Sequence, residues 1–149
     1  MLNFSYTSLV KSVDRPDRNL VAKIIRRSLQ QSYSVVSLSI VIVDNETSQN
    51  YNLEYRNKNK PTNVISLECA EQRSQFNMLT GELILADEVI RQEALEQNKS
   101  VVSHYVHMLV HGVLHLQGFD HQNDLDAEKM EQIEIDIMAS LGYSNPYTI

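Results

Sequence analysis

Apolar residues alternate with polar ones along some stretches of this chain and recur at helical spacing along others. From Val35 to Val43 every second residue is apolar, which predicts a half-buried strand. Shorter runs predict further strands at 2–6, 64–67 and 81–85, with a polar loop at 69–79. Helices are predicted at 18–31, from Asp44 or Asn45 to about Arg56, from a capping Asp87 to about 98, and at 101–117 and 123–141.

The interleaving of these strands and helices predicts an α+β (α/β-like) fold, with a mixed sheet flanked by helices. The run 101–117 is apolar nearly all round, so we expect it to be a buried central helix. In the last helix, the residues at helical spacing that we expect to face the core are Leu125, Met130, Ile133, Ile137 and Leu141. A length of 149 residues suits one domain spanning 1–149.

Composition narrows the class of protein. Charged residues make up 21% and hydrophobic residues 42% of the chain, which disfavours disorder. We find no apolar run near 18 residues and no signal-peptide pattern, so a cytoplasmic protein is expected. Cys69 is the only cysteine, which excludes an intrachain disulfide. We expect Cys69 to be a small buried side chain rather than a nucleophile.

The net charge of −6 conceals an uneven distribution along the chain. Residues 1–60 carry nine Lys/Arg and five Asp/Glu, whereas residues 61–149 carry four and fourteen. A polyanion could therefore approach a local basic face of an acidic molecule. Two basic groups are candidates for that face, although either could be an ordinary solvated surface: Lys23, Arg26 and Arg27 on an early helix, and Arg56, Lys58 and Lys60 in a loop.

All five histidines fall between His104 and His121, and three of them have the spacing H-x₃-H-x₅-H. His111 and His115, four apart, share one helix face with Cβ atoms about 6 Å apart, so their imidazoles can approach one ion. Gly118 permits a sharp turn that can return His121 as a third ligand. Three protein ligands leave the fourth position of a tetrahedral Zn²⁺ open, as in catalytic sites. One zinc ion per chain is therefore expected, the alternative being three structural histidines.

His107 competes for the role of third ligand. On a straight helix it lies about 12 Å from His115, at ~1.5 Å per residue, which is too far for both to bind one ion comfortably. We therefore expect His107 to support the site from behind the ligands or to be a core histidine. His104 is expected to be a partly exposed helix residue with no special role.

Gly112 separates this pattern from the H-E-x-x-H of metalloproteases, in which glutamate follows the first histidine and acts as general base. Glycine cannot transfer a proton, so the chemistry must differ. A glycine inside a helix also costs about 1 kcal/mol relative to alanine. Close approach of a substrate or another backbone, or simple packing, would explain its presence.

The segment 111–121 resembles H-G-x-L-H-L-x-G-[YF]-D-H, the signature of the YbeY family. Residues 55–66 are similar to that family's Y-R-x-K-D-K-P-T-[DN]-V-L-S, and residues 81–85 resemble its G-D-I-x-I. Met130 and Glu131 resemble its downstream acidic helix. The resemblance covers roughly residues 50–141. The positions at which this chain differs from the family pattern, such as Asn59 and Glu82 in place of Asp, do not include the histidines.

The resemblance implies a single-strand-specific, metal-dependent endoribonuclease with a sheet of about four strands. It implies a role in rRNA processing, including maturation of the 16S rRNA 3′ end, and in ribosome biogenesis and quality control. The expected partners are single-stranded RNA, rRNA and ribosomal particles, with neither DNA nor a membrane.

Arg56 is the residue that both the resemblance and its chemistry favour as catalytic, because a guanidinium can grip a phosphate with two parallel hydrogen bonds. Its alternative is a structural ion pair with a helix carboxylate. Further residues could support the site or contact the substrate: His107, Asp120, Ser66, Lys58 and Lys60. Asp120 could orient a ligand histidine or serve as a turn residue, and Ser66 could contact the sugar-phosphate backbone or simply lie in its strand.

Two other functions remain open from the sequence. One is a ribosome-assembly factor with a mainly structural zinc, which a closed four-ligand site would favour. The other is a metalloprotease whose base comes from elsewhere, such as Glu82. For the endoribonuclease, the nucleophile is either a zinc-activated water or the RNA's own 2′-hydroxyl, and the general base is unassigned.

Overall fold

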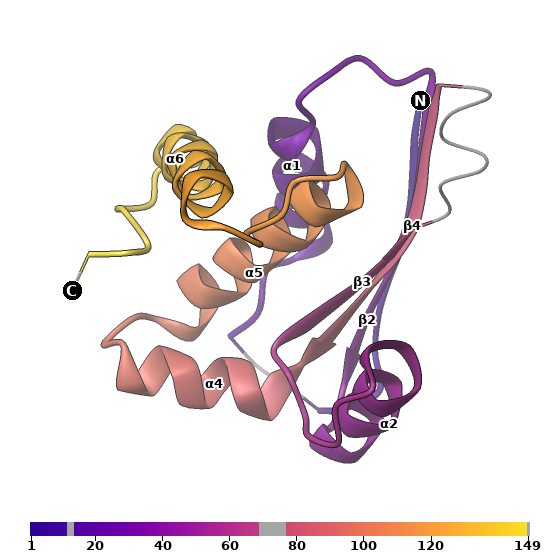
Figure 1. Cartoon of the computed structure of the whole chain (residues 1–149), viewed down its shortest axis with the longest axis vertical. Helices are drawn as coiled ribbons and strands as arrows, with labels where there is room; N and C mark the ends of the chain where they lie inside the picture. The colour runs from indigo at the N-terminus through magenta and orange to yellow at the C-terminus, as the bar shows by residue number, and fades with distance from the viewer. Residues whose placement is uncertain (12–13, 69–76, 149) are drawn as a thin grey trace.

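The computed structural model describes residues 1–11, 14–68 and 77–148, which form one four-stranded sheet and five helices of the α+β class (Figure 1). The strands are β1 (Leu2–Ser8), β2 (Val35–Val43), β3 (Val64–Glu68) and β4 (Met78–Ala86). The helices are α1 (Arg18–Ser28), α2 (Asn45–Arg56), α4 (Asp87–Glu96), α5 (Val101–Leu116) and α6 (Asp124–Ser140).

The sheet is mixed, as predicted, with strand order β1-β2-β4-β3. β1 and β4 both run parallel to β2, and β3 is an antiparallel edge strand paired with β4. The alternation seen in the sequence of β2 is real: Val36, Leu38, Ile40 and Ile42 are buried. They belong to the main hydrophobic core, on the face of the sheet covered by α1 and α5.

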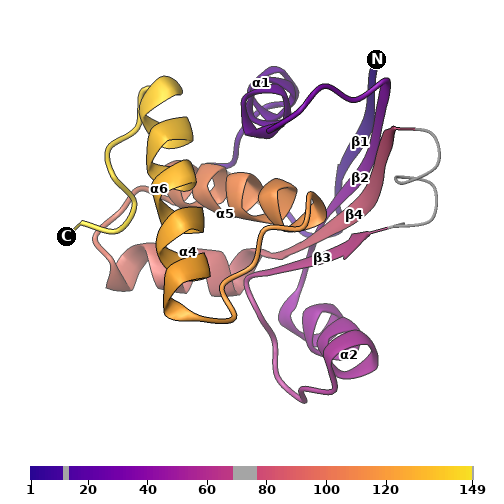
Figure 2. The same cartoon turned by 45° about the horizontal axis from the view of Figure 1, so that its top comes forward.

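Helix α5 is the central helix, as predicted, and is buried along most of its length. It contacts β3 and β4 on one side and α1, α4 and α6 on its others, so it lies between the sheet and α6 (Figures 1 and 2). Helix α2 lies on the opposite face of the sheet, where Tyr51 packs on a small cluster formed by Val43, Ile65 and Ile84. Among the described residues no helix, α5 included, has both the length and the hydropathy that a membrane span requires.

Two glycines allow α5 to lie directly against the sheet. A Cβ on Gly112 would stand 2.9 Å from Cδ2 of Leu83 in β4. A Cβ on Gly81 would stand 2.7 Å from Cδ2 of Leu116 and 2.9 Å from the carbonyl oxygen of Leu67. Packing against the sheet therefore accounts for the glycine inside the ligand helix.

Three details of the sequence prediction need correction. β4 begins at Met78, so Leu79 is a buried strand residue and not part of a loop, because pairing with β2 extends the strand. Ala86 is the N-cap of α4, and the Asp87 side chain does not cap the helix but pairs with Arg91 at 2.9 Å and accepts from the Tyr105 hydroxyl.

Leu125 is 75% exposed, because it lies in the first turn of α6, whose buried residues begin further along. The expectations for 69–76, Cys69 included, fall outside the described residues.

Candidate metal centre

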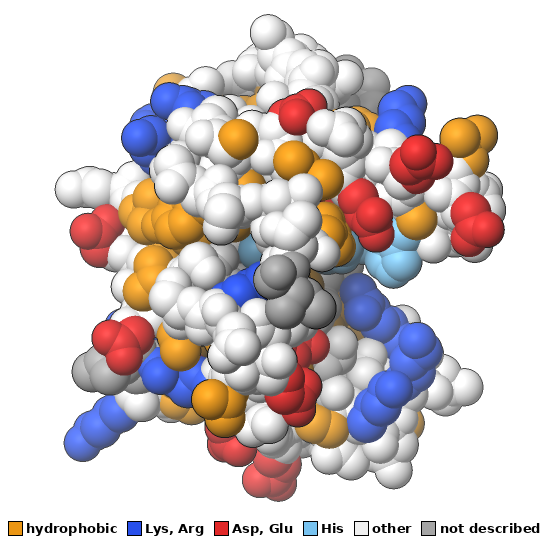
Figure 3. Space-filling model, turned by 90° about the vertical axis from the view of Figure 1, so that its left-hand side faces the viewer, with side chains coloured by type: hydrophobic (Ala, Val, Ile, Leu, Met, Phe, Trp, Pro, Cys, Tyr) orange, Lys and Arg blue, Asp and Glu red, His pale blue; other side chains and the backbone are white. Residues whose placement is uncertain are grey.

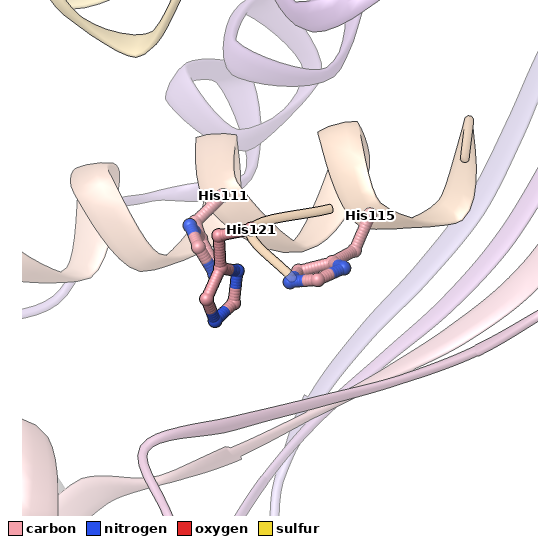
Figure 4. A group of neighbouring side chains, drawn as sticks. All are labelled: His111, His115 and His121. Carbon is pink, nitrogen blue, oxygen red and sulfur yellow. The ribbon is translucent and has the colours of Figure 1, made fainter. Parts of the chain in front are cut away.

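The three histidines predicted as ligands lie together (Figure 4). His111 and His115 project from the same side of α5, and His121 reaches them from the segment that follows the helix. One ring nitrogen from each lies within 4.8 Å of the others. Nitrogens about 2.1 Å from one tetrahedral zinc would lie somewhat closer than this, which rotations of the side chains can achieve. The triad can therefore hold a metal ion.

The turn that returns His121 is built around Gly118. Gly118 has φ +96°, a conformation that side chains rarely adopt, and the backbone N–H groups of Gly118 and Phe119 cap the last turn of α5. The Asp120 carboxylate then accepts from the backbone N–H of His121 at 2.7 Å, while 3.7 Å separates it from His121 Nδ1. This geometry suits the turn role of Asp120 better than the orienting role.

Arg56 lies across a cleft from the triad. The cleft has a volume of about 610 Å³, and its lining includes Arg56, Lys58, Asn63, His111, His115, Asp120 and His121. We call it the histidine–arginine cleft. Figure 3 shows histidine side chains on one side of a hollow and Lys or Arg side chains on the other. No carboxylate among the described residues pairs with Arg56, so the structural ion pair considered as its alternative is absent there.

The basic loop after α2 is held in place by polar residues that the sequence reading did not single out. Asn57 ends α2 in the left-handed conformation, with φ 57°. The buried Asn52 side chain donates to the Lys60 carbonyl at 2.8 Å, and Ser48 exchanges two hydrogen bonds of 3.0 Å with the backbone of Thr62. Ser48 and Asn52 are four apart on α2, so one helix face fixes the loop that carries Lys58.

The two remaining candidates do not line the histidine–arginine cleft. Ser66 donates a 3.2 Å hydrogen bond to the carbonyl oxygen of Gly112, which ties β3 to α5. It also lines a neighbouring cleft of about 290 Å³ together with Arg56, His115 and Asp120. Lys60 is exposed and is not among the residues lining either cleft.

Behind the triad lies a residue that the sequence reading missed. Glu134 of α6 is only 1% exposed, and its Oε1 accepts from His111 Nδ1 at 2.8 Å and from His107 Nε2 at 3.1 Å. Burial tends to raise the pKa of this carboxyl, but the hydrogen bonds from His107 and His111 outweigh it and lower the pKa to about 2. An ionised carboxylate only accepts, so His111 donates from Nδ1 and keeps Nε2 free for a metal.

Tyr147, near the C-terminal end of the chain, completes this arrangement. Its hydroxyl donates to Glu134 Oε2 at 2.5 Å, and its ring lies edge-on to the ring of His107. Burial and the Glu134 carboxylate raise the pKa of Tyr147, which keeps the hydroxyl protonated as a donor. Each oxygen of the buried carboxylate therefore has a donor.

The other two histidines of α5 are buried. His107 donates to Glu134, the same carboxylate that holds His111. The expectation for His104 was wrong: it is 2% exposed and bonds Glu93 at 2.9 Å, because α4 packs over that face of α5. Glu93 also accepts from Asn63, a residue of the histidine–arginine cleft.

The electrostatic environment favours a neutral imidazole at His115. Burial, together with the neighbouring His111 and His121, lowers the pKa of His115 to about 4. A neutral imidazole has a free lone pair, which is the form that binds a metal. Three histidines around one point therefore fit a divalent ion of the kind that imidazole binds, such as zinc.

The family model described as "Endoribonuclease YbeY" matches residues 6–142 of this chain. The chain belongs to the YbeY endoribonuclease family. Proteins named "Endoribonuclease YbeY" are similar to it in three bacteria: 43% identical in Chromobacterium violaceum (89% of this chain and 79% of that protein), 50% in Colwellia psychrerythraea (74% and 71%), and 40% in Laribacter hongkongensis (99% and 89%). The resemblance seen in the sequence is thereby confirmed.

A solved structure supports the fold. The solution structure of TM1509 from Thermotoga maritima aligns over the whole of both chains with a TM-score of 0.51 at 16% identity. That likeness concerns the fold and no particular residue. The family membership and the triad together direct attention to the histidine–arginine cleft.

Proposed function

We propose that this chain is a zinc-dependent endoribonuclease that cleaves single-stranded RNA, with its active site in the histidine–arginine cleft. Its place in the YbeY family supports the class of reaction. We further propose that it acts in the cytoplasm on rRNA, including the 3′ end of 16S rRNA, and on ribosomal particles.

The observation that carries the proposal is the placement of Arg56 opposite three histidines that can share one ion. A phosphodiester in the cleft would meet both at once. The cluster contains three ligands among the described residues, which leaves a coordination position for substrate. His107 is not part of the group of three histidines whose ring nitrogens lie within 4.8 Å of one another.

The reacting phosphate is held by residues of the α2 end and the loop that follows. Arg56 would donate two parallel hydrogen bonds to phosphate oxygens and stabilise the charge that develops on them. Lys58, in the same cleft, would add a second positive charge. Zn²⁺ held by His111, His115 and His121 would supply Lewis-acid chemistry to the phosphate. A flexible single strand can bend into such a recess, whereas a stiff duplex cannot easily do so.

Metalloprotease chemistry is disfavoured by the position of Glu82. Side chains alternate between the faces of a strand, so Glu82 shares a face with Ile84, opposite Leu83, which packs toward α5. Glu82 therefore lies on the side of the sheet away from the triad and cannot act as its base.

The experiment that tests the proposal measures cleavage of an end-labelled single-stranded RNA from the 3′ end of 16S rRNA by zinc-loaded protein. Arg56→Ala should retain zinc and its melting temperature while losing about a hundredfold or more in rate. The same RNA annealed to its complement should be cut much more slowly. Treatment with a chelator should abolish cleavage, and added zinc should restore it.

Lys129→Ala is the control, because Lys129 is an exposed basic residue on α6 that is not among the residues lining the cleft. It should cleave like the parent. Equal cleavage by parent and Arg56→Ala would refute the role of Arg56 and point to a contaminating nuclease. No cleavage by either, with zinc bound, would favour a ribosome-assembly factor.

A further inference from the structure

Tyr147 links the end of the chain to the metal centre. The C-terminal segment 143–148 folds back beside α6 (Figure 2), and the buried Pro146 in it accepts a hydrogen bond from Lys99, in the connection between α4 and α5. This anchoring places the Tyr147 hydroxyl 2.5 Å from Glu134 Oε2. The Tyr147 residue is itself 43% exposed, and its hydroxyl and ring contact the buried Glu134 and His107.

The Tyr147 hydroxyl contacts the carboxylate that orients the ligand His111. Glu134 has two carboxylate oxygens, and turning the carboxylate would move Oε1 away from His111 Nδ1. The hydrogen bond to Oε2 opposes that rotation. Without this hydrogen bond, a buried charged oxygen would lack a donor, and the carboxylate would be free to turn toward a different donor. A histidine held through its second nitrogen is both oriented and fixed in one tautomer.

We propose that Tyr147 is a positioning residue of the metal centre, which holds His111 in its ligating orientation and tautomer through Glu134. The inference rests on the zinc site of the proposed function. It assigns a role in metal affinity to a residue 36 positions from the ligand it supports and outside the family-model match, which ends at residue 142.

The experiment compares Tyr147→Phe with Tyr143→Phe. The first removes only the hydroxyl and keeps the ring beside His107. The second removes the hydroxyl of a half-buried tyrosine in the same segment, and that hydroxyl bonds no described residue. Zinc affinity is measured by competition with a chromophoric chelator, and the ligand geometry by the visible spectrum of the cobalt-substituted protein.

Tyr147→Phe should weaken zinc binding about tenfold and alter the cobalt spectrum, while the metal-free protein melts close to the parent. Tyr143→Phe should match the parent in both measurements. Because Tyr147 acts through Glu134, the double variant Glu134→Gln/Tyr147→Phe should bind zinc within about twofold of Glu134→Gln alone.

Two results would overturn the inference while leaving the proposed function intact. One is parent-like zinc affinity and cobalt spectrum in Tyr147→Phe. The other is a double variant whose loss is the product of the two single losses, since Tyr147 would then act independently of Glu134. A parent protein that binds no zinc would instead overturn the metal centre, and the inference with it.

Discussion

The triad has a front, which borders the cleft, and a back, which contacts Glu134. The two sides differ in how many of their polar groups already have a partner. At the front, His115, His121 and Arg56 border an open cleft, and no carboxylate pairs with Arg56 among the described residues. At the back, the buried Glu134 carboxylate receives hydrogen bonds from two histidines and a tyrosine. We infer that the two sides have different roles. The back holds the ligand histidines in place, and the front leaves a coordination position and Arg56 available to a substrate.

The largest effect is expected at the front, from His115→Ala. Removing one of three ligands should eliminate stoichiometric zinc binding and reduce RNA cleavage to background, because two imidazoles hold zinc poorly. Elemental analysis of the purified protein gives the zinc content per chain. His104→Gln, which alters a buried histidine of the same helix outside the triad, should retain zinc. Full zinc content in His115→Ala would show that the triad is not the metal site.

At the back, Glu134→Ala should lower the free energy of unfolding of the metal-free protein by about 3 kcal/mol. The loss arises because His107, His111 and Tyr147 would keep donors without their acceptor in a buried environment. Urea denaturation measures it. Glu131→Ala, an exposed glutamate on the same helix, should change stability by less than about 0.5 kcal/mol. Equal losses in the two variants would mean that the carboxylate at the back is not structurally important.

The smallest effect expected is a difference in pH dependence between front and back in the metal-free protein. His115 has its pKa lowered to about 4 in the folded state. As the pH falls, the unfolded chain therefore takes up a proton at this residue at a higher pH than the folded protein does. Its contribution to stability is therefore present above pH 6.5 and is lost as the pH falls toward 4. Glu134, with its pKa lowered to about 2, contributes above pH 4.5 and loses that contribution as the pH falls toward 2.

Thermal unfolding of metal-free His115→Gln and Glu134→Gln across this range separates the two contributions. As the pH falls, the parent protein should lose stability. His115→Gln should lose less stability than the parent mainly between pH 6.5 and 4, and Glu134→Gln should lose less mainly below pH 4.5. If the two variants differed from the parent over the same interval, the front and the back would titrate as one unit.

The ligand triad could be predicted from sequence because its geometry is local. His111 and His115 are one helical turn apart, and Gly118 ends the helix with the positive φ that the return of His121 requires. The central position of α5 could be predicted for a similar reason, since its apolar residues leave no solvated face. These features depend on helix periodicity and on the conformational freedom of glycine, both of which are properties of short segments.

Glu134 and His104 were missed because their roles depend on how α6 and α4 pack against α5. One signal was available for Glu134: it lies four residues after Met130 and three before Ile137, both buried, so it is a carboxylate on the apolar face of its helix. A charge at such a position requires partners when buried. No comparable signal indicated His104, whose partner Glu93 lies on another helix.

By itself, then, the sequence determined the elements, the mixed sheet and the three histidines around one point, because hydrophobic periodicity and residue spacing act over a few residues. The tertiary structure alone decided what surrounds them. It placed Arg56 across the cleft, Glu134 behind His111 and Tyr147 against Glu134, since each of these contacts joins segments that are brought together only when the helices pack around the buried α5.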